Sequence, residues 1–198
     1  MATGVIADIH NGFLTSNKTQ QVMNRLIKII SGSVLMGIYF LASTQVMAQT
    51  SKEEFMSKWK NSKQFTLDVL DKMPDSGMDY KTDPAAMSFK EQIHHIGSSI
   101  VGISQEYLMG GEPDFSIDVT TASKTELSDY VAKCYDYGTK AMAAITPEQG
   151  KETQHVFGNQ ASRNQVMALL MDHSTHHRGA AIAYLRSNGV EPPAFVGF

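Results

Sequence analysis

The sequence has a single cysteine, Cys134, so packing and not an internal disulfide must hold the fold together. It also has no excess of basic residues, because 17 Lys and Arg stand against 20 Asp and Glu, for a formal charge of −3, and no cluster of Lys and Arg is visible along it. Proteins that bind nucleic acid use clustered cations to displace counterions, and we therefore exclude nucleic acid as a partner. No stretch between the apolar periodic segments alternates apolar and polar residues as a clear strand does. These absences favour an all-α domain.

A long apolar run that could span a membrane is missing as well. The run near the N-terminus, Ile29 to Ala42, has 14 residues and contains two glycines, whereas a spanning helix needs about 20 apolar residues. Arg25 and Lys28 give this run a basic start, and Val-Met-Ala at 46–48 follows it as a small-residue cleavage site. These three parts are those of a secretory signal peptide.

The chain is therefore expected to have three parts. Residues 1–22 form an upstream extension without structure, residues 23–48 the signal peptide, and residues 49–198 one mature domain with its own core. We expect the mature domain to be periplasmic or secreted, with no stable membrane span after the signal is cleaved.

Four serines begin stretches of helical periodicity, and each is followed three residues later by Glu or Gln. In this capping box the serine accepts a hydrogen bond from the backbone N–H three residues on, and the Glu or Gln side chain reaches back. The pairs are Ser51/Glu54, Ser88/Glu91, Ser123/Glu126 and Ser162/Gln165. Proline or glycine closes the stretches after Met73, Met109, Ile145 and Asn188. We predict four helices of about 20 residues and an all-α four-helix bundle. The longest connection, Pro147 to Ala161, has room for a short hairpin around "VFGNQ".

The third predicted helix carries its apolar residues on one side. Its stripe consists of Leu127, Tyr130, Val131, Cys134, Gly138, Ala141 and Ile145. Cys134 is therefore interpreted as a core residue and not a nucleophile, because a reactive thiol needs an exposed, electropositive setting.

The fourth predicted helix contains three histidines within "DHSTHHRGAA" (172–181). His173 and His177, four residues apart, share one helical face along the centre of the apolar stripe, at the spacing where two nitrogens can share one ion. His176 lies about 80° from that line, as a boundary residue or a partner of a ligand. Two neutral rings satisfied by hydrogen bonds alone are the structural alternative. The pair is not part of a zincin motif, because Ser174 stands where H-E-x-x-H has its glutamate.

A third ligand should come from a facing helix, and the second predicted helix offers His94 and His95. The two rings lie off the centre of its apolar stripe, on opposite flanks, so periodicity does not choose between them. The stripe consists of Phe89, Ile93, Ile96, Ile100, Ile103 and Tyr107.

Two short motifs connect the second and fourth helices to a known family. One is a serine seven residues before an H-I pair, and the other is H-x-x-x-H-R-G. Their residues are Ser88, His95, Ile96, His173, His177, Arg178 and Gly179. A four-helix chain with these motifs resembles the DinB-like superfamily of metal-binding bundles. The similarity covers residues 51–198, including the Pro-containing tail "GVEPPAFVGF".

This resemblance implies that His95, His173 and His177 bind a divalent metal ion. Three neutral imidazoles keep the full +2 charge, which would acidify bound water and leave positions open for a small-molecule substrate. Imidazole suits Zn, Ni, Fe or Cu, so the sequence does not name the metal. Characterised members include S-transferases that use bacillithiol or mycothiol and a mycothiol-dependent isomerase, so a thiol is one implied substrate.

The sequence thus supports a metal-dependent enzyme, transferase-like or hydrolase-like, that activates a thiol or water. Arg178 and Tyr184 are candidates for orienting the substrate, and Glu106 is a candidate proton carrier. The structural alternatives are a surface or bundle-edge charge for Arg178 and a solvated Glu106. Two other functions remain open, a non-catalytic metal-binding or envelope stress protein and a purely structural bundle. A homodimer through an outer helix face is a candidate assembly.

Overall fold

The computed structural model describes residues 21–26, 28 and 51–197. Residues 21–26 and 28 are helical. The rest of the predicted upstream extension and signal peptide, including the cleavage site, lies outside the described residues. Within the described part of the chain, no helix has both the length and the apolar character that a membrane crossing requires.

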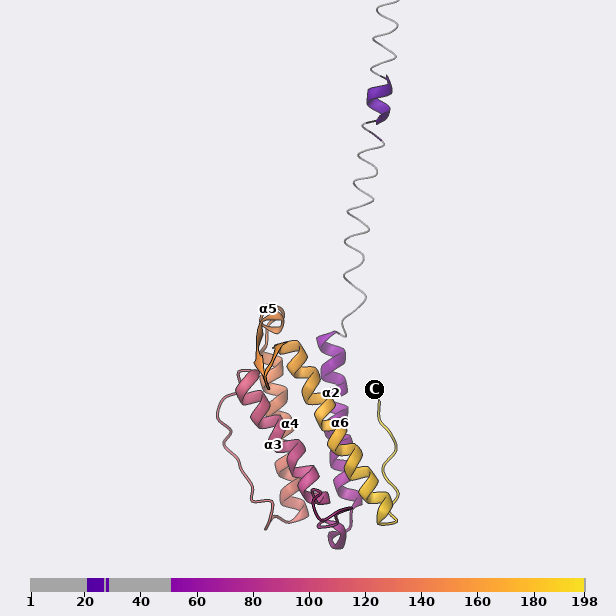
Figure 1. The fold of residues 1–198 in the computed structure, drawn as a ribbon, viewed down its shortest axis with the longest axis vertical. Helices are drawn as coiled ribbons and strands as arrows, with labels where there is room; N and C mark the ends of the chain where they lie inside the picture. Colours follow the sequence, from indigo (N-terminus) through magenta and orange to yellow (C-terminus); the bar gives the residue numbers. More distant parts are fainter. Residues whose placement is uncertain (1–20, 27, 29–50, 198) are drawn as a thin grey trace, which may run out of the picture. The chain divides into compact units, whose positions relative to one another are not determined.

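Four long helices form the bundle predicted from the sequence (Figure 1). They are α2 (Lys52–Lys72), α3 (Phe89–Tyr107), α4 (Lys124–Ala144) and α6 (Arg163–Ser187). Each begins directly after its predicted serine, and all four capping boxes are formed in both directions. Three helices end with the predicted residue as their C-cap, and α3 ends slightly earlier, with Leu108 as its C-cap. The all-α four-helix bundle is confirmed.

The connection between α4 and α6 contains the predicted hairpin. Strand β1 (Thr153–Val156) pairs antiparallel with β2 (Asn159–Ser162). Phe157 and Gly158 join them with φ angles of 47° and 83°, the left-handed values of a two-residue hairpin turn. The same connection contains a short helix that was not predicted, α5 (Pro147–Lys151), which has its own capping box between Thr146 and Gln149. A 3-10 turn, η1 (Asp75–Gly77), follows α2 and was also not predicted.

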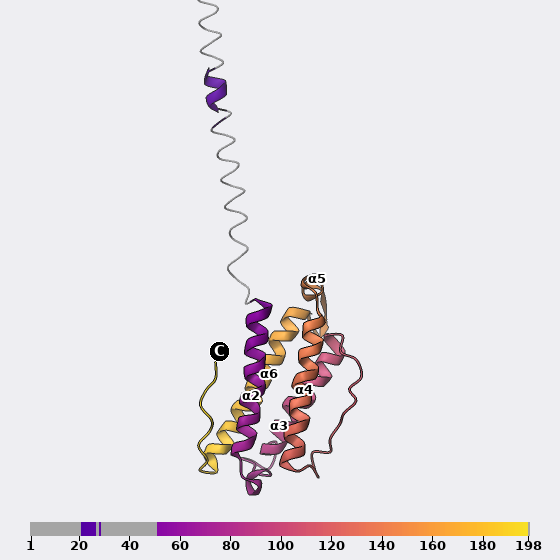
Figure 2. The same ribbon diagram turned by 180° about the vertical axis from the view of Figure 1, so that it is seen from behind.

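The order and direction of the helices differ from a simple up-and-down bundle. Helices α3 and α4 run parallel, and α2 and α6 run parallel to each other in the opposite direction (Figures 1 and 2). A crossover loop, residues 108–123, returns the chain along the bundle from the end of α3 to the start of α4. Because α6 runs antiparallel beside α3, histidines from these two helices can face each other.

The core lies between the four apolar stripes. All six stripe residues predicted for α3 are buried. In α4, Cys134 is fully buried, and burial raises the pKa of its thiol to about 12, which confirms the core interpretation. Trp59 of α2 packs on Tyr135 of α4 with ring centroids 4.9 Å apart. Gly138 lets α4 pack closely on both α2 and α3, because a Cβ atom there would lie 3.2 Å from Cζ2 of Trp59 and 2.7 Å from a methyl carbon of Ile100.

Candidate metal site

Three histidines from two antiparallel helices meet on one side of the bundle. His95 comes from α3, and His173 and His177 come from α6. Each offers one ring nitrogen to the cluster, and these three nitrogens all lie within 4.8 Å of one another. The ring centroids are 5.0 Å apart for His95 and His173 and 4.5 Å apart for each of the other two pairs. The three rings are half-buried. The structure therefore brings together the residues that the resemblance implied as metal ligands.

The structure decides which of the two neighbouring histidines of α3 belongs to the site. The periodicity of the sequence left both His94 and His95 as candidates. His94 lies on the other flank of α3, where its ring stacks on Tyr130 of α4 with centroids 5.3 Å apart and planes 14° apart. It therefore supports the α3–α4 contact, and only His95 faces α6. The choice depends on which helix lies on which side of α3, and the apolar pattern of α3 does not contain that information.

The buried face of α6 is not centred where the sequence placed it. We expected the centre line to run through His173 and His177, but the buried residues beside them are Ser174, Arg178 and Ala181, at 1%, 7% and 0% exposed, while the two histidines are only half-buried. The two histidines occupy the flank toward α3. The reason is that α6 packs against both α2 and α3, so its buried arc is wider than its apolar stripe and includes polar residues.

The environment keeps the three clustered histidines neutral. Burial lowers the pKa of His95 and of His173 below 6.5, and the neighbouring histidines lower that of His173 further. Burial also lowers the pKa of His177, and with the charge effects of His173, His95 and His176 it falls to about 4. At neutral pH each ring therefore has one nitrogen lone pair free to bind a cation.

Gln92 is a member of the site that sequence reasoning missed. Its side-chain oxygen Oε1 lies 2.6 Å from Nδ1 of His177. Gln92 is 8% exposed and lies three residues before His95 on α3. A glutamine among helix residues gives no sequence signal for this contact, because the bond crosses from α3 to α6. Another polar contact is local, between Ser99 Oγ and His95 Nε2 at 3.4 Å.

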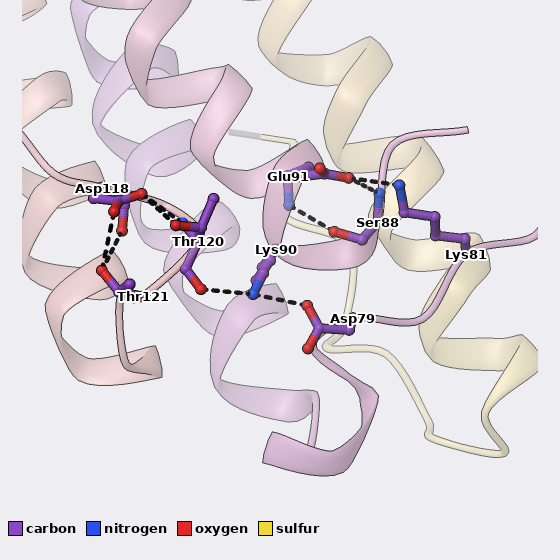
Figure 3. A network of polar contacts seen from close by, with 8 residues as sticks. All are labelled: Asp79, Lys81, Ser88, Lys90, Glu91, Asp118, Thr120 and Thr121. Carbon is purple, nitrogen blue, oxygen red and sulfur yellow. Dashed lines mark hydrogen bonds and ion pairs between the residues drawn. The ribbon is translucent and has the colours of Figure 1, made fainter. Parts of the chain in front are cut away.

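The first turn of α3, which contains Gln92 and precedes the turn of His95, is fixed by ion pairs and a capping box (Figure 3). Glu91 bonds the backbone N–H of Ser88 at 2.6 Å and pairs with Lys81 at 3.1 Å. Lys90 pairs with Asp79 at 2.7 Å, and its ammonium group also donates to the carbonyl of Thr120 in the crossover loop at 3.4 Å. These contacts tie the start of α3 to the two loops beside it. Within the crossover loop, the carboxylate of Asp118 accepts hydrogen bonds from Thr120 and Thr121.

The surface or bundle-edge interpretation of Arg178 is wrong, because Arg178 is 7% exposed. It points toward α2, where Nη1 donates to Ser62 Oγ at 2.7 Å and to Thr66 Oγ1 at 3.1 Å. Nη2 donates to Thr175 Oγ1 at 3.2 Å, and the guanidinium carbon lies 5.0 Å from the centre of the Phe65 ring. Among the described residues, no carboxylate pairs with it. The sequence missed this burial because two of the three hydroxyl partners, Ser62 and Thr66, lie on another helix.

Three other residues named in the sequence analysis are Tyr184, Glu106 and His176. Tyr184 is 5% exposed, and its hydroxyl donates to the carbonyl of Met87 at 3.0 Å. Glu106 is exposed at the end of α3, as its structural alternative expected. His176 is exposed beside His177, with ring centroids 4.9 Å apart. The catalytic roles of Arg178, Tyr184 and Glu106 stay predictions.

The donor set fits a divalent ion with open coordination positions. Nitrogens bound at about 2.1 Å from a tetrahedral ion lie about 3.4 Å apart, so small rotations of half-buried side chains would close the cluster. Three protein ligands leave at least one coordination position open, whereas closed structural zinc sites have four protein ligands. Imidazole does not select one metal among Zn, Ni and Fe.

Comparison with known proteins agrees with the fold. Similar solved structures include a DinB-like protein from Bacillus cereus, with 19% identity, a TM-score of 0.60, and coverage of 73% of this chain and 97% of that one. The DinB-like protein YjoA from Bacillus subtilis has 20% identity and a TM-score of 0.59, over 72% of this chain and 96% of that one. YfiT from Bacillus subtilis, described as "a probable metal-dependent hydrolase with an unusual four-helix bundle topology", has 16% identity and a TM-score of 0.58, over 72% and 91%.

A search of curated proteins gives no match. The model of the DinB family matches residues 47–197, which is three quarters of the sequence and all of the bundle. The chain belongs to the DinB family.

Proposed function

We propose that this protein binds one divalent metal ion through His95, His173 and His177 and uses it to activate water or a thiol for attack on a small electrophile. The observation that carries the proposal is the convergence of three ring nitrogens to within 4.8 Å of one another. Residues on two helices, 78 or more positions apart in the sequence, have no local reason to gather three imidazoles at one point.

The residues of the chain prepare this site for a cation. Burial keeps the three rings neutral, so their lone pairs are available at neutral pH. His177 is held by Gln92, and the first turn of α3 is held by the ion pairs around Glu91 and Lys90. A divalent cation bound there supplies Lewis acidity and lowers the pKa of a nucleophile at the open positions.

A hydrolytic reaction is the branch of this proposal that the comparisons support. YfiT shares the fold and is described as a probable metal-dependent hydrolase. The proposal also includes export, because residues 23–48 have the three parts of a signal peptide and would direct the domain to the periplasm or outside the cell. Water is available as a nucleophile in either place, whereas transfer to a thiol would need an external thiol.

A second candidate function is metal binding without catalysis, in a sensor or envelope stress protein. The placement of the candidate catalytic residues favours it. Arg178 and Tyr184 already bond within the bundle, and Glu106 is exposed on the solvent side of α3. This candidate predicts a loaded site and no turnover.

An activity screen with matched variants separates the two. The protein would be loaded with Zn²⁺, Ni²⁺ or Fe²⁺ and tested with activated esters, and with small electrophiles plus a thiol. Catalysis by the ion predicts a rate that a chelator and His95→Ala abolish and that His94→Ala leaves unchanged, because His94 stacks on Tyr130 outside the cluster. A rate that is insensitive to chelator and to His95→Ala would refute catalysis at this site.

A further inference from the structure

We propose that Gln92 is a positioning residue that fixes the proton of His177 on Nδ1 and so presents Nε2 of that ring to the metal ion. The inference rests on the proposed metal binding and deepens it, because it assigns the ligand atom of one histidine and the residue that selects it.

The contact itself gives the direction of the hydrogen bond. The atom of Gln92 that lies 2.6 Å from His177 Nδ1 is the carboxamide oxygen. A carboxamide oxygen only accepts, so Nδ1 must carry the proton and donate. A neutral imidazole has one N–H, and its other nitrogen, Nε2, then keeps the lone pair. The hydroxyl of Ser99 beside His95 can donate or accept, so that contact does not select a tautomer in the same way.

Burial and anchoring make this bond a fixed part of the site. Gln92 is 8% exposed, so little water competes for its oxygen. Its backbone N–H bonds the carbonyl of Ser88 at 2.9 Å, and Ser88 belongs to the capping box that Glu91 completes. The carboxamide therefore projects from a turn of α3 that a capping box and ion pairs hold in place, the turn shown in Figure 3.

The position of Gln92 also couples the two helices of the site. It lies three residues before His95 on α3, nearly one helical turn, so α3 supplies both a ligand and the partner that orients a ligand on α6. Without this partner the His177 ring can turn over and exchange Nδ1 for Nε2, which adds an entropic cost to binding. Loss of such an orienting partner typically weakens metal affinity by about 10- to 100-fold.

A neutral partner has a chemical consequence for the cation as well. A carboxylate at this position would make His177 a stronger donor and reduce the positive charge that the ion presents to its other ligands. The carboxamide orients the ring without adding a negative charge. We therefore expect Gln92→Glu to keep the tautomer and to bind metal at least as tightly as the original protein.

The tautomer can be tested without metal. In the chelator-treated protein, the ¹⁵N chemical shifts of the histidine rings report which nitrogen is protonated. We expect His177 to be protonated at Nδ1 in the original protein and in Gln92→Glu, and to lose this preference in Gln92→Met, which keeps a similar volume. Protonation of His177 at Nε2 in the original protein would overturn the inference.

Metal affinity supplies the second readout. In competition titrations with Zn²⁺, Gln92→Met is expected to bind about 10- to 100-fold more weakly. The control Gln105→Met changes the same residue type thirteen positions further along α3 and should leave both readouts unchanged. A Gln92→Met affinity within threefold of the original protein would contradict the inference. If the original protein binds no Zn²⁺, the proposed function fails, and the ring shifts still decide the role of Gln92.

Discussion

Gly138→Ala tests whether α4 packs against α2 and α3 as closely as the structure shows. In a helix interior this change normally stabilises a protein by about 1 kcal/mol, because alanine has the higher helix propensity. At Gly138, however, the added Cβ would lie 2.7 Å from Cγ2 of Ile100 and 3.2 Å from Cζ2 of Trp59. Both neighbours are 1% exposed, so they have little room to move.

The expected size of the effect follows from these distances. Carbon atoms pack best at about 3.5–4.0 Å, so the contact with Ile100 is short by roughly 1 Å. The methyl group of Ile100 is attached to a stiff β-branched carbon and does not swing away easily. Overpacking of this kind costs about 1–3 kcal/mol, and we take the upper half of that range. After subtracting the gain in propensity, Gly138→Ala should lower the free energy of unfolding by about 1–2 kcal/mol.

Gly102→Ala in α3 is the matched control, because nothing lies within 4 Å of a Cβ placed there. It should raise the free energy of unfolding by about 0.5–1 kcal/mol. Urea and thermal unfolding of both variants, with chelator present so that metal does not contribute, would measure the difference. For a domain of this size the two melting temperatures should differ by about 5–10 °C. A Gly138→Ala variant as stable as Gly102→Ala would refute the packing of α4 described above.

Three further predictions concern the buried arginine, the histidines and the cysteine. Arg178→Ala should lower the free energy of unfolding by about 2–4 kcal/mol in urea titrations, because it leaves a cavity and removes the cation from three hydroxyl partners; a loss below 1 kcal/mol would contradict its role in the core. His177 has a folded pKa of about 4, below its ordinary value of 6.5, so the unfolded chain takes up the proton first as the pH falls. The melting temperature of the metal-free protein should therefore fall between about pH 6.5 and pH 4, less steeply in His177→Gln, and equal pH profiles would count against this histidine as the cause. Cys134 should react with a thiol reagent only at the rate of unfolding, because its thiol is fully buried and its pKa is about 12; rapid labelling of the native protein would show that the α3–α4 contact opens.

The helices could be predicted from the sequence because their signals are local. A capping box needs only a serine and a Glu or Gln three residues later, and the four predicted boxes are all present. The α5 helix was missed although Thr146 and Gln149 form the same box, since five residues are too few to show an apolar stripe. The parallel run of α3 and α4 was not predicted either, because a crossover loop of this length leaves both directions open.

The site could be predicted only in part. The spacing of His173 and His177 on one helix points to a shared ion, and that spacing is visible in the sequence. The choice of His95 over His94 came from the family resemblance alone, because it depends on which helix faces which flank of α3. Gln92 and Arg178 act through partners on other helices, so no pattern within one helix could assign their contacts.

The central claim is that three imidazoles from α3 and α6 hold one divalent cation, and the most direct test is to count the metal. Elemental analysis of the protein, purified without chelator and dialysed against a metal-free buffer, should find about one equivalent of a divalent transition metal per chain. His95→Ala should lose that metal, whereas His94→Ala should keep it. A protein without bound metal, or a His95→Ala variant with the same metal content as the original, would contradict the account.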